Sequence, residues 1–182
     1  MQRNLAFIDI ESTGLDLERH EIIQIGCVLV KPIPRAGKGP TLEVLEEFEL
    51  KIKPERIKDA DPQALLVNGY NEADWIFAID IKKALEVLAE KVKDAVMVGH
   101  NVSFDHAFLE KAFEKNGIKN TMHYRKLDTI SIAYAKLYND GDIEKFSLRA
   151  LCEKLGIENK HAHTALSDAR ATFELYKKLL VD

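Results

Sequence analysis

The sequence has little cysteine, no long apolar run and no excess of basic residues. Its only two cysteines, Cys27 and Cys152, lie in apolar segments without metal-ligand spacing, so both are expected to be reduced core residues of a cytoplasmic protein. No run approaches the roughly 20 apolar residues that cross a bilayer, and no membrane partner is expected. The amino-terminal segment lacks a signal peptide's apolar stretch and cleavage site, because acidic residues interrupt it early.

The charge balance is slightly acidic. With 26 basic and 30 acidic residues among 182, the formal net charge is −4, so the chain as a whole has no basic field that would attract a polyanion. If the protein acts on nucleic acid, the attraction must come from bound metal ions or from local basic patches. The apolar fraction of 46% is typical of a globular protein, and residues 1–182 are expected to form a single domain.

The first third of the chain predicts strands, and the remainder predicts alternating helices and strands. Strands are expected where apolar and β-branched residues gather, over residues 5–10, 22–30, 42–52, 95–98 and 124–129. The Pro and Gly content of residues 31–40 predicts an exposed hairpin loop. Helical periodicity is found over residues 79–92, 103–116, 130–137, 147–155 and 164–180. Ser103 is the expected N-cap of the second helix, and Gly117 is expected to end it. This order favours an α/β fold with a mixed sheet flanked by helices.

Two acidic residues directly follow an apolar run in the segment NLAFIDIESTG. Asp9 and Glu11 are two residues apart on a predicted strand, so both side chains leave the same face of the sheet. Neighbouring carboxylates in a partly buried site repel each other, and a divalent cation between them removes that repulsion. Their oxygen ligands suit Mg²⁺ or Mn²⁺. The alternative is a strand end that emerges into solvent, and this stretch alone does not separate the two interpretations.

Two later segments place acidic residues near helix starts. Asp105, in VGHNVSFDHAFL, follows a strand that ends at Gly99, and open α/β sheets bind ligands at such strand ends. Taken singly, it is better explained as an acid that complements a helix dipole than as a catalytic residue. Asp168, in NKHAHTALSDARATFELY, lies in the last helix, and His163 precedes it by five residues. Histidine is suited to accept a proton from water near neutral pH, although a lone histidine at a helix start is usually a cap or a surface residue. Four acids and a histidine in three separate segments together favour one shared site.

These three segments resemble the motifs of the DnaQ-like, DEDD-type 3′–5′ exonuclease superfamily. The motif D-x-E-T/S-T-G is matched by DIESTG at 9–14, H-N-x-x-F-D by HNVSFD at 100–105, and H-x-A-x-x-D-A by HTALSDA at 163–169. The secondary segments LDT at 127–129 and SLRALCEKLGI at 147–157 agree, and the resemblance covers residue 5 to about residue 180. A tyrosine four residues before Asp168 would mark the other branch, but that position is Thr164. The chain therefore resembles the DEDDh subgroup, and within it the proofreading epsilon-subunit type of DNA polymerase III.

The resemblance implies a ribonuclease H-like fold, with a mixed sheet that is mostly antiparallel at its start and is flanked by helices. It also implies a hydrolase that releases nucleoside 5′-monophosphates from the 3′ end of single-stranded DNA or RNA, with DNA favoured. Two Mg²⁺ or Mn²⁺ ions would be held by Asp9, Glu11, Asp105 and Asp168, and His163 would be the general base. Thr13, Gly14 and Leu15 match positions that line the terminal nucleotide, whereas His100, Asn101 and Phe104 would shape the pocket and support Asp105.

Two departures from the family pattern concern substrate handling. Many relatives carry arginine where this chain has Thr164, and histidine where it has Asn68; neither change removes a catalytic group. Two other functions are compatible with parts of the pattern. One is an accessory module that docks a DNA polymerase through its surface. The other is a haloacid-dehalogenase-type phosphatase, because DIEST loosely resembles D-x-D-x-T, although Glu11 fits poorly as the second acid of that motif.

Overall fold

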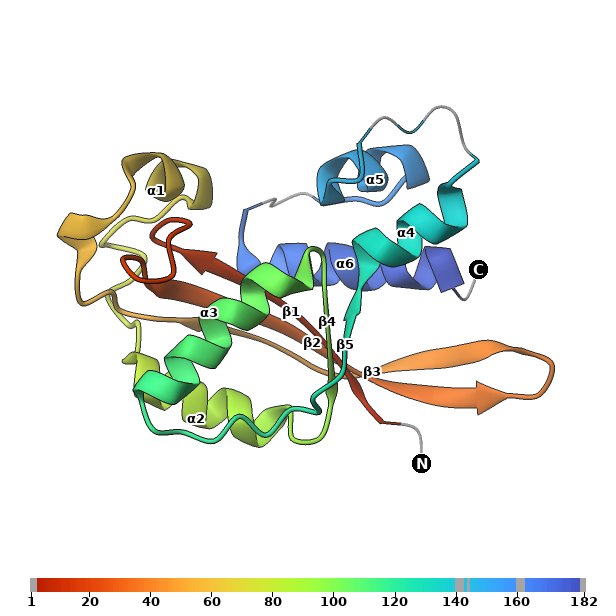
Figure 1. The fold of residues 1–182 in the computed structure, drawn as a ribbon, viewed down its shortest axis with the longest axis horizontal. Helices are drawn as coiled ribbons and strands as arrows, with labels where there is room; N and C mark the ends of the chain where they lie inside the picture. The colour runs from red at the N-terminus through yellow and green to blue at the C-terminus, as the bar shows by residue number, and fades with distance from the viewer. Residues whose placement is uncertain (1–2, 140–142, 144, 160–162, 181–182) are drawn as a thin grey trace.

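The computed structural model describes residues 3–139, 143, 145–159 and 163–180, without the side chains of residues 38 and 39. The elements in this part of the chain are β1 (Leu5–Ser12), β2 (Ile22–Arg35), β3 (Lys38–Lys51), the 3-10 turn η1 (Ile57–Asp59), α1 (Pro62–Asn68), α2 (Ile81–Lys91), β4 (Val96–Gly99), α3 (Val102–Lys115), β5 (Lys126–Asp128), α4 (Thr129–Leu137), α5 (Leu148–Leu155) and α6 (Ala165–Leu180). Figure 1 shows the helices arranged around one twisted sheet.

The sheet has the strand order β3-β2-β1-β4-β5. β1 pairs with β2 and β2 with β3 in antiparallel fashion, whereas β1 pairs with β4 and β4 with β5 in parallel. This is the mixed sheet, antiparallel at its start, that the sequence predicts. The β1–β4 ladder is short and covers only residues Leu5 to Phe7 of β1. The rest of β1 extends past the end of β4, which leaves that side of the strand open to another element.

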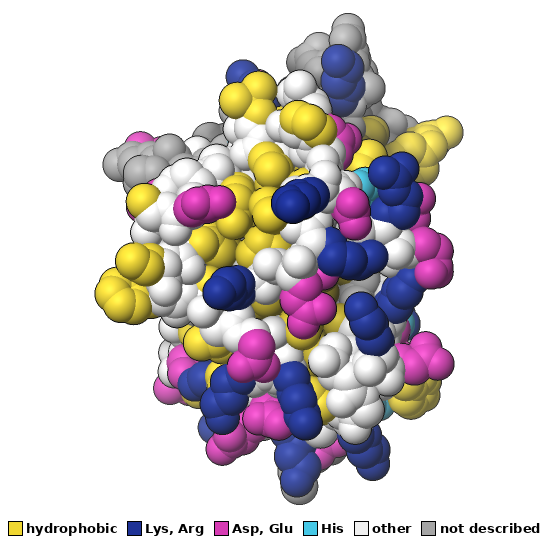
Figure 2. Space-filling view, turned by 90° about the vertical axis from the view of Figure 1, so that its left-hand side faces the viewer, with side chains coloured by type: hydrophobic (Ala, Val, Ile, Leu, Met, Phe, Trp, Pro, Cys, Tyr) yellow, Lys and Arg dark blue, Asp and Glu magenta, His cyan; other side chains and the backbone are white. Residues whose placement is uncertain are grey.

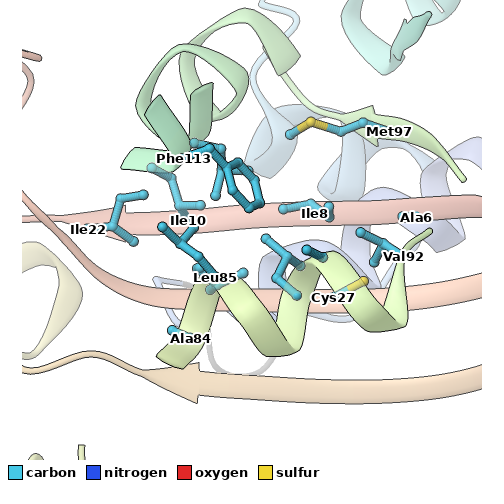
Figure 3. Packing of buried hydrophobic residues seen from close by; sticks show 14 of the residues in the cluster. Ala6, Ile8, Ile10, Ile22, Cys27, Ala84, Leu85, Val92, Met97 and Phe113 are labelled. Atoms are coloured by element: carbon cyan, nitrogen blue, oxygen red, sulfur yellow. The ribbon is translucent and has the colours of Figure 1, made fainter. Parts of the chain in front are cut away.

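The two faces of β1 pack against different helices. Ala6, Ile8 and Ile10 belong to the larger core cluster, which also contains the buried apolar residues of α2 and α3. Figure 3 shows these side chains meeting between sheet and helices. Leu5 and Phe7 belong to a second cluster with the α6 residues Ala169 and Phe173. Because side chains alternate along a strand, Asp9 and Glu11 continue the row of Leu5 and Phe7 on the α6 face.

The hairpin between β2 and β3 is longer than the sequence predicts. An exposed loop over residues 31–40 is wrong, because pairing continues from Lys31↔Glu43 through to Arg35↔Lys38, leaving a tight turn at residues 36–37. The paired strands project as a ribbon beyond the rest of the sheet (Figure 1). In a two-stranded ribbon, each strand has one unpaired edge, where proline loses no ladder hydrogen bond. The Pro and Gly content therefore predicts a longer loop than the two-residue turn that the structure has.

Two helix starts also differ from the prediction. Ser103 is not the N-cap of α3: the cap is Asn101, in the left-handed region with φ +67°, and its side chain makes no capping bond. The backbone N–H groups of Asn101 and Val102 instead donate to the carboxylate of Asp128, a partner distant in sequence. The short helix α1 was not predicted, although Asp61 caps it.

The cysteines and the helices bear on two of the expectations from composition. Cys27 and Cys152 are buried and free, as predicted. None of the helices in the described part of the chain is long and apolar enough to cross a membrane.

Candidate active site

Three of the predicted acidic residues meet on the α6 face of the sheet. Asp9 and Glu11 come from β1 and Asp168 from α6, and one carboxylate oxygen of each lies within 4.8 Å of the others. The alternation of β1 places the first two together, and the packing of Ala169 and Phe173 against Leu5 and Phe7 brings α6 across them. Residues more than 150 positions apart in the chain therefore form one acidic cluster.

Asp105 reaches the same region from the other side of β1. It is 4% exposed, and its Oδ1 accepts a hydrogen bond of 2.9 Å from the backbone N–H of Ile10. Ile10 lies beyond Phe7, where the ladder between β1 and β4 has ended, so this N–H has a side-chain partner in place of a strand partner. The hydrogen bond fixes the Asp105 carboxylate against the backbone of Ile10, the residue between Asp9 and Glu11.

The electrostatics of the cluster favour protonated carboxyls unless a cation is bound. Burial, followed by repulsion from Asp105, Asp168 and Glu11, raises the pKa of Asp9 well above its usual range. Burial and the charges of Asp168 and Asp105 raise the pKa of Glu11 to about 7. Burial also raises the pKa of Asp105 to about 7, although the Ile10 hydrogen bond opposes the shift. An oxygen-only donor set with surplus negative charge fits Mg²⁺ or Mn²⁺.

Two residues of β2 position the start of α6, and sequence reasoning missed both. A Cβ on Gly26 would lie 2.2 Å from the carbonyl carbon of Ala165 and from the nitrogen of Leu166, so only glycine permits this approach of helix to strand. Gln24 is 2% exposed, and its Oε1 accepts a 3.0 Å hydrogen bond from the backbone N–H of Ala165. The available signal was a glutamine and a glycine inside the apolar strand IIQIGCVLV.

His163 lies at the edge of the cluster. Its side chain is exposed, its backbone has φ +72°, and its backbone N–H donates to Oδ2 of Asp168 at 3.0 Å. The left-handed conformation is uncommon for a residue other than glycine, and such strain often accompanies functional sites.

His100 links the end of β4 to two later segments. Its Nδ1 lies 2.9 Å from Thr129 Oγ1 and its Nε2 lies 2.9 Å from the carbonyl oxygen of Phe146. Burial lowers the pKa of this imidazole. Both ring nitrogens therefore have hydrogen-bond partners within the protein. These bonds hold the end of β4 against the segments that carry Thr129 and Phe146. Asp128 has a similar bracing role, because it caps α4 through Ile130 N–H as well as the start of α3.

The predicted substrate residues after β1 divide into buried and exposed members. Thr13 is 1% exposed, and its hydroxyl accepts a hydrogen bond from Glu21 N–H. Asn68 is also buried and donates to the carbonyl oxygen of Ser12. The His20 ring covers Gly14 so closely that a Cβ would lie 2.3 Å from it. Leu15, in contrast, is 78% exposed.

Asn101, at the N-cap of α3, is exposed. The half-buried ring of Phe104 packs against Phe108, with the ring centroids 4.9 Å apart. The structure thus offers Leu15, Asn101 and part of Phe104 to a ligand, whereas Thr13, Asn68 and His100 hold the surrounding backbone. Their predicted contacts with substrate stay predictions.

Comparison with known proteins identifies the family. The family model for exonucleases (RNase_T) matches residues 6–176. The chain belongs to this exonuclease family. This membership removes the haloacid-dehalogenase-type phosphatase as an explanation of the DIEST segment, and it agrees with the resemblance inferred from the three motifs.

Relatives within the exonuclease family include polymerase components. The chain is 31% identical over 173 residues to the DNA polymerase III subunit epsilon of Aquifex aeolicus, covering 95% of this chain and 78% of that protein. It is 30% identical over 180 residues to a PolC-type DNA polymerase III of Caldanaerobacter subterraneus subsp. tengcongensis, covering 99% of this chain. The matched region is only 12% of that polymerase, so the exonuclease-family region is a small part of the larger protein.

A solved structure gives the same fold. The crystal structure of E. coli exonuclease I in complex with a dT13 oligonucleotide superimposes with a TM-score of 0.78 at 19% identity. The match covers 97% of this chain and 41% of exonuclease I. The predicted ribonuclease H-like architecture is therefore confirmed at the level of fold.

Proposed function

We propose that the protein is a metal-dependent 3′–5′ exonuclease that hydrolyses phosphodiester bonds at the 3′ end of a single strand and releases nucleoside 5′-monophosphates. The observation that supports this most is the meeting of Asp9, Glu11 and Asp168 within 4.8 Å, with Asp105 bound to the same stretch of β1, in a chain of the exonuclease family. Residues 1–182 would act as one catalytic domain.

In this proposal, Asp9, Glu11, Asp105 and Asp168 hold two Mg²⁺ or Mn²⁺ ions. When bound, such a pair stabilises charge on the attacking and leaving oxygens of an in-line phosphoryl displacement. His163 acts as the general base that takes a proton from the attacking water, a role supported by its exposed side chain and by the contact of its backbone with Asp168. The exposed Leu15 is proposed to contact the terminal nucleotide together with Asn101.

Single-stranded DNA is the favoured substrate class, and RNA is the alternative. The oligonucleotide complex of exonuclease I and the name of the Aquifex relative support DNA; the latter also supports a DNA polymerase as a second partner. Figure 2 shows basic and acidic side chains interspersed around apolar areas on the face that carries α1. Because no dominant basic surface is visible among the described residues of that face, bound metal ions are proposed to supply much of the attraction for phosphate.

The decisive experiment incubates the protein with 5′-labelled single-stranded DNA or RNA in the presence of Mg²⁺, Mn²⁺ or EDTA. We expect stepwise shortening from the 3′ end that EDTA abolishes. The polymer that is shortened faster, DNA or RNA, identifies the substrate class. Internal cleavage products, or shortening that persists in EDTA, would contradict the proposal.

Two substitutions test the assigned residues. Asp9→Ala should remove nearly all activity. His163→Ala should leave oligonucleotide binding intact while turnover falls by about 10²-fold or more, the scale of a lost general base. The matched control is His123→Ala, because His123 lies beside the opposite end of β4, where its N–H donates to the carbonyl of Ala95. Equal turnover of the His163 and His123 variants would remove His163 from the mechanism.

A further inference from the structure

Asn159 makes a direct contact with the acidic cluster that the mechanism above does not use. Its Nδ2 donates a 2.6 Å hydrogen bond to Oδ1 of Asp168. The hydroxyl of Ser167 donates in turn to Oδ1 of Asn159 at 2.7 Å. Since the Ser167 hydroxyl occupies the amide oxygen, the amide N–H₂ is the side that faces Asp168.

Asp168 needs such a support more than its two neighbours do. Asp9 and Glu11 extend from a central strand that is paired over its length with β2, whereas Asp168 approaches from the first turn of α6. Its carboxylate is close to two others, and repulsion favours any rotation that moves it away. The Asn159 amide and the His163 backbone N–H occupy one oxygen each, which opposes that rotation.

We propose that Asn159 is a positioning residue: its amide, oriented by Ser167, holds the Asp168 carboxylate toward Asp9 and Glu11 so that the three can share a divalent ion. This inference rests on the proposed metal-dependent function, but it concerns a residue outside the three sequence motifs. Partners that orient a ligating carboxylate typically contribute 10- to 100-fold in metal affinity or activity. Asn159 touches neither substrate nor the reacting atoms in this account.

The test is a Mn²⁺ titration by calorimetry, without nucleic acid, of wild type, Asn159→Ala and Ser167→Ala. We expect Asn159→Ala to bind Mn²⁺ about 10- to 100-fold more weakly, and Ser167→Ala to be weakened less, because it keeps the amide donor. On a labelled oligonucleotide at fixed Mn²⁺, kcat should fall for Asn159→Ala while KM stays near the wild-type value. Asn120→Ala is the matched control, since Asn120 donates its amide to Glu110 at the far end of α3; it should behave as wild type.

Thermal unfolding in EDTA separates positioning from folding. A cooperative transition in EDTA shows that a variant is folded, and Mn²⁺ affinities are compared only among folded variants. If Asn159→Ala fails to fold, the Mn²⁺ affinity of Ser167→Ala decides the question. Weaker binding than wild type supports the inference, and wild-type binding overturns it. Wild-type Mn²⁺ affinity in the folded Asn159 variant overturns the inference while leaving the exonuclease proposal standing, whereas a wild-type protein that binds no Mn²⁺ overturns both.

Discussion

The acidic cluster predicts that the metal-free protein is less stable at pH 8 than at pH 5. Glu11 has its pKa raised from 4.5 to about 7 in the folded protein. Between these values the folded state retains a proton that the unfolded state has released, so the free energy of unfolding falls as the pH rises. The stabilisation is fully present below pH 4.5 and is lost as the pH passes 7.

The size of the effect follows from the shift. One pKa unit corresponds to about 1.4 kcal/mol, so the change at Glu11 is worth on the order of 3 kcal/mol. Asp105, with its pKa raised to about 7, acts in the same direction. The two contributions are not summed, because the carboxylates share their mutual repulsion.

Urea unfolding in EDTA at pH 5 and pH 8 measures this difference. Trp75 is the single tryptophan of the chain, is buried, and donates its indole N–H to the carbonyl of Ile23, so its fluorescence reports loss of the core. Glu11→Gln removes the titrating group at nearly constant volume. We expect this variant to exceed wild type by on the order of 3 kcal/mol at pH 8 and by at most about 1 kcal/mol at pH 5.

Adding Mn²⁺ at pH 8 should stabilise wild type more than Glu11→Gln, because binding to the folded state adds to the free energy of unfolding. Glu90→Gln, at an exposed position of α2, is the control for a simple change of net charge. Equal stability of wild type in EDTA at both pH values, or a Glu11→Gln variant no more stable than wild type at pH 8, would refute the electrostatic reasoning.

Two further predictions concern the packing of α6 against β2. Gly26→Ala should destabilise the protein by roughly 1–3 kcal/mol through overpacking and weaken Mn²⁺ binding by displacing Asp168, as urea unfolding and calorimetry would show; unchanged Mn²⁺ affinity would mean that the helix position does not control the cluster. Gln24→Ala should cost roughly 1–3 kcal/mol because the N–H of Ala165 loses its buried partner; wild-type stability in the same urea assay would contradict this capping role.

Much of the fold was predictable because its signals are local. The alternation of Ala6, Ile8 and Ile10 with Phe7 predicts a strand with two apolar faces, and the same alternation places Asp9 and Glu11 together. Helical periodicity located α2, α3, α5 and α6 to within a few residues. The ribbon over residues 31–40 was mispredicted because composition does not reveal which strand edges are unpaired.

The amino-acid sequence by itself determined which side chains are available for the site: the acids Asp9, Glu11, Asp105 and Asp168, and the histidine at 163. Only the tertiary structure decided how they are held. Gln24 and Ala165 are 141 positions apart, and the contacts of Ile10 with Asp105 and of Asp128 with α3 are likewise distant. Such partners leave no periodic pattern, because they depend on where β4 ends and on how closely α6 approaches Gly26. Local chemistry therefore indicates the candidate catalytic groups, whereas long-range packing sets their geometry.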